Sequence, residues 1–225
     1  MSDQDAFDRI LVALYDAMLD DGRWPVASVL IDEACGLQGH VLSVGGGPQD
    51  DQSLCSFVEF YHRGQRRADI LDEYFERYFS LDERVPRYAR LPDSQLVHVT
   101  DLYTDEELKT SPIYNEILPR YSLQDSLNSR LVEPDGTHVV WIMHNPATPD
   151  GWQSPQVALL RGLAPHLRQF VRVRQALARA GALGATGTAL LGNPRLGVIS
   201  LDQHGRRVTL RSGWPRAGRC ATWPG

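Results

Sequence analysis

Apolar residues recur at helical spacing in three segments of the chain, residues 7–19, 26–35 and 68–79. In the third segment the apolar positions form a wide stripe on one side, and acidic residues occupy the other side. Gly22 and Gly36 follow the first two segments, where glycine is typical of a helix end. We therefore predict three amphipathic helices, each with one face packed against a core.

Shorter runs of apolar, β-branched and aromatic residues predict strands between and after these helices. Pro134-Asp135-Gly136 separates the last two runs and favours a hairpin turn. Thr100 or Thr104 can cap a short helix, and Ser111-Pro112 can begin another. The expected strands are residues 40–44, 54–61, 96–99, 122–132 and 137–144.

This order of elements predicts an α+β domain, with an antiparallel sheet and helices packed on one side of it. Ser154-Pro155 begins a long helix whose apolar residues recur in alternating steps of three and four, with Pro165 expected to kink it. Two interpretations remain open, because such a helix can pack on its own domain or pair with a second copy. In a homodimer, the contacts would be Leu160, Leu163, Leu167, Phe170 and Leu177.

Composition and charge narrow the function classes. The apolar content of 42% is typical of a globular protein, and the net charge of −5 argues against direct binding of nucleic acid. The N-terminus is acidic, and no apolar run approaches the ~20 residues that span a bilayer, so we expect no membrane contact. Three cysteines at unrelated spacings fit neither a disulfide framework nor a zinc site. These features predict a cytoplasmic protein.

The sequence contains no recognisable catalytic constellation, and we expect no enzyme activity and no cofactor. Gly45-Gly46-Gly47 lacks the lysine and the following helix of a phosphate-binding loop. His138 and His144 would lie roughly 20 Å apart along one strand, so they cannot hold one metal ion. We therefore expect no metal site.

Aromatic residues are dense in the middle of the chain, and most of them are expected to belong to the core. Several are tyrosines, whose hydroxyl groups need partners when they are buried. A mostly apolar pocket with a few polar groups is typical of a site for a small ligand. If such a pocket exists, the predicted ligand-binding residues are Phe57, Tyr61, Tyr74, Tyr78 and Trp141.

Four segments, in the right order, resemble the sensory region of LuxR-like bacterial transcription regulators. These regulators have an N-terminal GAF- or PAS-like domain and end in a helix-turn-helix. The segments are Arg23-Trp24-Pro25, Ser111–Pro119, Leu159–Leu167 and Leu196–Val208. The resemblance implies a domain that alters transcription in response to a signal. It supplies no ligand residues, because the tryptophan- and aspartate-bearing motif of acyl-homoserine-lactone receptors has no clear counterpart here.

With this resemblance, the chain divides into a sensory domain (1–153), a signalling or dimerisation helix (154–180), a linker with an incomplete PAS-like hairpin (181–210) and a tail (211–225). Lys109 is the only lysine, which is typical of GC-rich coding DNA. The tail is rich in Arg, Gly, Trp and Pro, as out-of-frame reading of such DNA would produce. A frameshift and a genuine truncation with a disordered tail are both open. Each predicts a chain without a recognition helix.

The leading hypothesis is a signal-sensing domain of a LuxR-like regulator that lacks its DNA-binding domain. It would bind a small molecule and relay the change through a dimerising helix. The alternative is a ligand-free interaction module that acts by pairing with full-length regulators.

Overall fold

The computed structural model describes residues 3–45, 55–133, 136–145 and 151–192. Within these residues, the centre of the molecule is an antiparallel sheet of six strands in the order β3-β2-β1-β6-β5-β4. The strands are β1 (Gly39–Gly45), β2 (Cys55–His62), β3 (Gln65–Arg66), β4 (Leu96–His98), β5 (Ser126–Val132) and β6 (His138–His144). The pairing of β1 with both β2 and β6 joins the N-terminal and C-terminal hairpins into one sheet.

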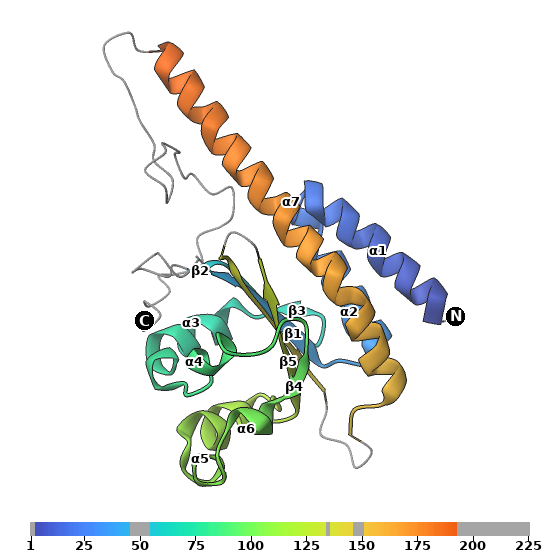
Figure 1. Ribbon diagram of the computed structural model, residues 1–225, viewed down its shortest axis with the longest axis vertical. Coiled ribbons are helices and arrows are strands. Elements are labelled where there is room, and N and C mark those ends of the chain that lie inside the picture. The colour runs from blue at the N-terminus through green and yellow to red at the C-terminus, as the bar shows by residue number, and fades with distance from the viewer. Residues whose placement is uncertain (1–2, 46–54, 134–135, 146–150, 193–225) are drawn as a thin grey trace.

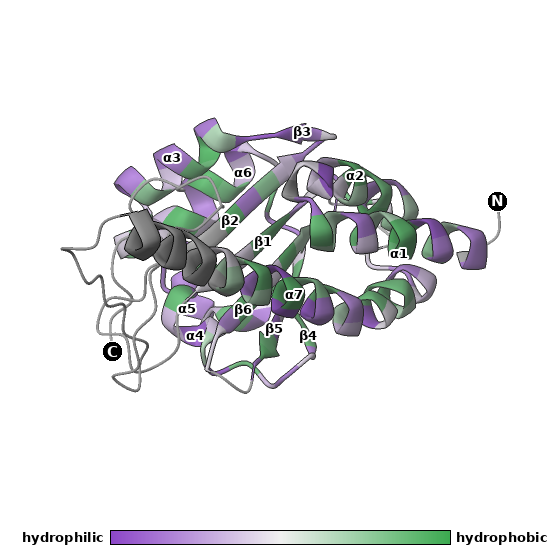
Figure 2. Ribbon diagram, turned by 90° about the horizontal axis from the view of Figure 1, so that it is seen from above, coloured by the Kyte–Doolittle hydropathy of each residue, from purple (hydrophilic) through white to green (hydrophobic). Residues whose placement is uncertain are grey.

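Helices cover both faces of this sheet (Figure 1). One face carries α1 (Asp3–Leu19), α2 (Trp24–Cys35) and α7 (Ser154–Gly192), and Figure 2 shows apolar and polar residues alternating around α1 and α7. The other face carries α3 (Ala68–Arg77), α4 (Val85–Tyr88), α5 (Asp105–Thr110), α6 (Leu118–Arg120) and the short turns η2 (Phe79–Leu81), η3 (Val99–Leu102) and η4 (Ile113–Ile117). A further turn, η1 (Asp21–Arg23), joins α1 to α2.

The α+β class and the antiparallel sheet are as predicted, but the expectation of helices on one side only is wrong. The reason lies in the central strands, which are apolar on both faces. In β6, Trp141 and Met143 belong to the core beneath α7, whereas Val140 belongs to the core on the opposite face. A sheet with two apolar faces must be covered on both to remove them from water.

Gly39, at the start of β1, is required by close packing between β1 and β2. A Cβ atom at this position would lie 2.0 Å from the carbonyl oxygen of Tyr61 and 2.7 Å from Cα of His62. Any side chain would therefore push the two strands apart. This close approach brings His62 and His144 to either side of Gly39, since both residues are its register partners.

The structure resolves several local predictions. Thr104, and not Thr100, caps α5, through a complete capping box with Glu107. The helix predicted from Ser111-Pro112 is a π-helical turn, η4, that runs into α6. The long helix α7 is continuous through Pro165 and extends to Gly192, into the segment predicted as a linker. The predicted hairpin at 196–208 and the tail lie outside the described residues.

Candidate ligand-binding cavity

A mostly apolar cavity lies between the sheet and α3, and we call it the α3 cavity. The space that the centres of water molecules can occupy inside it is about 120 Å³, whereas about 10–15 Å³ suffices for one water. Strands β1, β2 and β6 form its floor, and α3, α4 and α6 form its walls. Its lining residues are Val41, Ser43, Val58, Phe60, Ile70, Leu71, Tyr74, Phe75, Phe79, Arg84, Val85, Tyr88, Ile117, Leu118, Leu123, Val140, Ile142 and His144.

The floor follows from the two-residue period of the strands. Val41 pairs with Phe60 on one side and with Ile142 on the other, and all three side chains line the cavity. Two residues further along, Ser43 lies between Val58 and Val140 in the same way. Three neighbouring strands thus present a flat apolar surface to α3.

The wall formed by α3 follows from its helical period. Ile70, Leu71, Tyr74 and Phe75 occupy one face of this helix and line the cavity. Acidic residues lie on the outer face, as the sequence predicted, and Asp72 is exposed. One amphipathic helix therefore forms a lid with an apolar inner surface and a charged outer surface.

A buried ion pair stands at one end of the cavity. Arg84 donates from Nε and Nη2 to the two carboxylate oxygens of Asp82, at 2.9 and 2.7 Å, and the two side chains are only 6% and 0% exposed. Tyr74 also donates its hydroxyl to Asp82, at 2.7 Å. Burial alone would raise the pKa of Asp82, but the charge and hydrogen bonds of Arg84 lower it. The pair is therefore ionised, and Arg84 brings a positive charge to the cavity wall.

His144 is a further polar residue of the cavity, and its ring forms no hydrogen bond with the described residues. Its side chain is buried, and neither ring nitrogen has a hydrogen-bond partner among the described residues. Burial, followed by the positive charge of Arg84, lowers its pKa to about 3. The ring is therefore neutral at physiological pH and offers one donor and one acceptor. An unpaired buried polar group costs about 1–3 kcal/mol, which a ligand with matching groups could recover.

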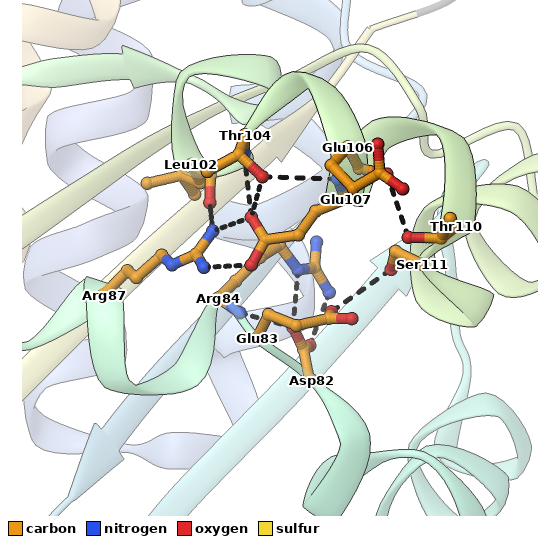
Figure 3. Close-up of polar contacts among 10 residues, drawn as sticks. All are labelled: Asp82, Glu83, Arg84, Arg87, Leu102, Thr104, Glu106, Glu107, Thr110 and Ser111. Carbon is orange, nitrogen blue, oxygen red and sulfur yellow. Dashed lines mark hydrogen bonds and ion pairs between the residues drawn. The ribbon is translucent and has the colours of Figure 1, made fainter.

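A polar network outside the cavity holds α4, which follows Arg84, against α5 and η4 (Figure 3). Arg87 forms an ion pair with Glu107 and donates to the carbonyl oxygen of Leu102. Ser111 donates to Glu83 at 3.1 Å. The hydrogen bond from Arg87 is the main reason that the pKa of Glu107 falls to about 2, so this clamp is charged at physiological pH.

The structure separates the five predicted ligand-binding residues. Tyr74 lines the α3 cavity, and Tyr78 packs beside the core of the same face without lining the cavity. Tyr61 and Trp141 point to the opposite face, into the core beneath α1 and α7. Phe57 belongs to β2, and its side chain lies outside the part that the structure describes. The sequence did not show which face of each strand lines the cavity. On β2 and β6, the lining residues are Val58, Phe60, Val140 and Ile142.

The predicted dimer seam of α7 is an intrachain contact. Leu160, Leu163, Leu167 and Phe170 are buried in the core formed with α1, α2 and the sheet, so they are not accessible to a second copy. Leu177 is the exception and is 43% exposed. Of the two interpretations of this helix, packing on its own domain accounts for these four residues.

Arg84 and His144 were not predicted as ligand contacts. Nothing in the local sequence distinguishes Arg84 from the other arginines, because its burial depends on Asp82 and on the fold around it. His144 was considered only as a metal ligand.

Among the described residues, no three His, Cys, Asp or Glu side chains are grouped as a metal site. In the same part of the chain, no helix is long and apolar enough to cross a membrane.

Comparison with known proteins finds solved structures with a fold similar to that of this chain. The sequence matches no protein-family model and no curated protein. Among solved structures, the ligand-binding domain of VqsR from Pseudomonas aeruginosa has a TM-score of 0.54 at 16% identity, over 76% of this chain and 97% of that one.

Two further solved structures have lower scores. The N-acylhomoserine-lactone-dependent LuxR-family factor CepR2 from Burkholderia cenocepacia has a TM-score of 0.44 at 13% identity, over 72% of this chain and 91% of that one. A GAF domain from Synechocystis has a TM-score of 0.43 at 19% identity, over 72% of this chain and 98% of that one. The likeness to VqsR confirms the predicted fold: the chain has an α+β architecture similar to that of the VqsR ligand-binding domain.

Proposed function

We propose that this domain is a sensor that binds a small, mostly apolar molecule with one hydrogen-bonding group in the α3 cavity. The observation that carries the proposal is His144, a neutral buried imidazole with two unpaired nitrogens on the floor of a mostly apolar cavity. The apolar lining would hold the body of the ligand, and His144 and Arg84 would orient its polar group.

Strand β6 offers a route from the cavity to α7. Its residues alternate between the two faces, so that Val140, Ile142 and His144 line the cavity while Trp141 and Met143 pack in the core beneath α7. A ligand that moves β6 therefore changes the packing of α7. The C-terminal part of α7 extends beyond α1 and the sheet, where it could transmit that change (Figure 1).

Thermal unfolding with a panel of ligands tests the proposal. The panel contains medium-length acyl chains that end in an amide, an ester or a carboxylate, and the carboxylates test the contribution of Arg84. At a concentration of about 100 Kd, a ligand of the folded state raises Tm by roughly 5–10 °C in a domain of this size.

Val140→Phe should abolish this increase, because the larger ring occupies the cavity next to Ser43. Val26→Phe makes the same change at an exposed position of α2 and should leave the increase intact. Circular dichroism of both variants shows whether the fold is kept. The proposal fails if no compound stabilises the wild type, or if folded Val140→Phe responds as the wild type does.

We also propose a homodimer, now through α1 in place of the buried seam of α7. Val12, Tyr15 and Leu19 follow one another at steps of three and four, and they are 62%, 46% and 75% exposed. Exposed apolar rows of this kind mark interaction surfaces. Leu19→Glu should shift the protein from dimer to monomer in size-exclusion chromatography with light scattering, whereas Leu81→Glu, at another exposed leucine, should not.

A monomeric wild type at all concentrations would contradict the dimer. It would also remove support from the alternative hypothesis of a ligand-free interaction module.

We further propose that the chain acts in the cytoplasm without enzyme activity and without direct contact with nucleic acid. The net charge of −5 supports the last of these points.

A further inference from the structure

A second pocket lies at the turn between β2 and β3, next to the end of α6, and we call it the arginine pocket. His62, Arg63, Arg67, Arg120, Tyr121 and Ser122 line it. The space open to the centres of water molecules is about 340 Å³, which is larger than in the α3 cavity. Three guanidinium groups from two separate segments of the chain thus border one polar pocket.

The charges around this pocket do not cancel. Arg67 forms an ion pair with Asp69 at 2.6 Å, and Arg120 forms one with Glu73 at 2.7 Å. Arg63 forms no ion pair with any described residue. The hydrogen bond from Arg67 lowers the pKa of Asp69, and hydrogen bonds from Tyr121 and then Arg120 lower the pKa of Glu73, so both groups are ionised at physiological pH. The three arginines and two carboxylates leave one positive charge without a partner.

His62 is an unpaired polar group on the wall of the pocket. Its residue is only 7% exposed, and Nδ1 has no hydrogen-bond partner in the described part of the chain. Burial, followed by the charges of Arg63 and Arg67, lowers its pKa below the usual value. The pocket therefore combines positive charge with a buried imidazole whose Nδ1 lacks a hydrogen-bond partner, an arrangement that an anion would complete.

The backbone on both sides of the pocket is held in an uncommon conformation. Among the described residues, three that are not glycine have positive φ, and two of them, Arg63 at 52° and Ser122 at 58°, line this pocket. Such conformations cost free energy and persist where the surrounding structure enforces them. The two turns bring Arg63 and Tyr121 to the pocket beside His62.

We propose that the arginine pocket binds a small organic phosphate, with Arg63 and His62 as its main contacts and Arg67 and Arg120 as secondary contacts. A guanidinium group matches the oxygens of a phosphate through paired, charge-assisted hydrogen bonds, and a doubly charged phosphate gains more from this field than a single carboxylate does. The proposal is independent of the α3 cavity, because the two pockets share no lining residue.

Binding at this pocket would act on α3. The two carboxylates that pair with Arg67 and Arg120 are Asp69 and Glu73, both on α3, and Glu73 also accepts a hydrogen bond from Tyr121 at 2.8 Å. A bound phosphate competes with these carboxylates for the two arginines. Because α3 is the lid of the α3 cavity, the arginine pocket is placed to change how firmly this lid is held.

Isothermal titration calorimetry tests the proposal with inorganic phosphate and a sugar phosphate at low ionic strength. We expect saturable binding that weakens as salt is added, since salt screens exposed charges. Arg63→Gln should weaken binding by about tenfold or more, because it removes a charge-assisted contact. Arg161→Gln, at an exposed position of α7, makes the same charge change and should leave the affinity unaltered.

A second variant and a second readout complete the test. Arg120→Gln should also weaken binding, and circular dichroism checks that α3 remains folded after its ion pair with Glu73 is lost. In NMR titrations, phosphate should raise the pKa of His62, because an anion offsets the charges of Arg63 and Arg67. Lack of saturable binding, an equal loss in Arg161→Gln, or acetate binding as tightly as phosphate would each overturn the proposal.

Discussion

Two buried histidines on neighbouring strands show how different the two faces of the sheet are. His40 in β1 faces α2, where its Nδ1 donates to Asp32 at 2.8 Å and its Nε2 lies 3.3 Å from the hydroxyl oxygen of Ser28. His144 in β6, one register position away, faces the α3 cavity and has no partner. Both ring nitrogens of His40 thus have partners within the chain, whereas both ring nitrogens of His144 are left available to a ligand.

The contrast also decides how the trio of Ser28, His40 and Asp32 should be interpreted. Its order of hydrogen bonds is that of a hydrolase triad. Ser28 and His40 are fully buried, however, and neither the α3 cavity nor the arginine pocket includes them. A substrate therefore cannot reach the hydroxyl group through either pocket. The trio holds α2 against β1. Both ring nitrogens of His40 have partners within the chain, which indicates a structural role, while the unpaired ring of His144 indicates a site.

The largest expected effect comes from removing one carboxylate on each face. Asp82→Ala leaves the buried guanidinium of Arg84 without its counter-charge, which should lower the free energy of unfolding by about 3–5 kcal/mol. Asp32→Ala removes one hydrogen-bond partner of His40 and should cost only about 1–3 kcal/mol. Urea denaturation followed by circular dichroism measures both values.

Asp16→Ala provides the control for this comparison, since Asp16 is exposed on α1 and the substitution should have almost no effect. Equal losses for Asp82→Ala and Asp32→Ala would show that the two faces do not differ in the way that their hydrogen bonds indicate.

Adjacent residues of β6 give the second comparison. Met143 is fully buried beneath α7, and its truncation to alanine should cost about 2–5 kcal/mol. Ile142 is only partly buried and borders a space that is already open, so Ile142→Ala should cost about 2 kcal/mol or less. The same denaturation experiment ranks the two variants. A larger loss for Ile142→Ala would mean that the cavity face is the more tightly packed one.

This alternation explains why the fold could be predicted more fully than the cavity. Strands and amphipathic helices have periods that are visible in the sequence, and the capping box of Thr104 and Glu107 is a local signal. In β6, however, Val140, Trp141, Ile142 and Met143 are all apolar. The sequence therefore does not tell which of them face α3, and Trp141, the aromatic residue among them, packs in the core beneath α7.

The long helix shows a related ambiguity. Apolar residues at steps of three and four pack equally well against another helix of the same chain or of a second copy. The seam of Leu160, Leu163 and Leu167 is covered by α1 and α2, from the other end of the chain. Such a contact depends on tertiary structure, and no local pattern distinguishes it from a dimer. The burial of Arg84 and Asp82, which are only two residues apart, likewise depends on tertiary structure.

Stability should also depend on pH through His144. Its pKa is about 3 in the folded protein and near 6.5 when exposed, so the unfolded chain binds more protons below pH 6.5. The folded state is therefore fully favoured above this pH and loses stability as the pH falls, by about 2 kcal/mol near pH 5. His144→Leu removes this contribution. Urea denaturation at about pH 7.5 and about pH 5 should show a smaller loss in the variant than in the wild type.

The quantity to compare is the loss of stability between the two pH values, in the wild type and in His144→Leu. The pKa of His62 and of His138 is lowered as well, but both residues are present in both proteins, so their contributions cancel in this comparison. At about pH 7.5, His144→Leu should be as stable as the wild type or more so, since it removes unpaired polar atoms from an apolar site. An unchanged pH dependence in the variant would show that the ring is not held neutral in the folded state.

The smallest effect concerns the clamp outside the cavity. Thr104→Ala removes the side-chain half of the capping box, in which Thr104 accepts from the backbone of Glu107 at 3.3 Å, and it should cost about 1 kcal/mol. Amide hydrogen exchange should become faster in α5 and in the adjoining α4, to which Arg87 and Glu107 tie it, while α1 and α7 keep their protection. Thr110→Ala, at the last residue of α5, is the matched control, because Thr110 only donates to the carbonyl oxygen of Glu106. Faster exchange in α7 as well would mean that the elements on the two faces of the sheet unfold together. The cavity face would then not unfold independently of the rest of the domain.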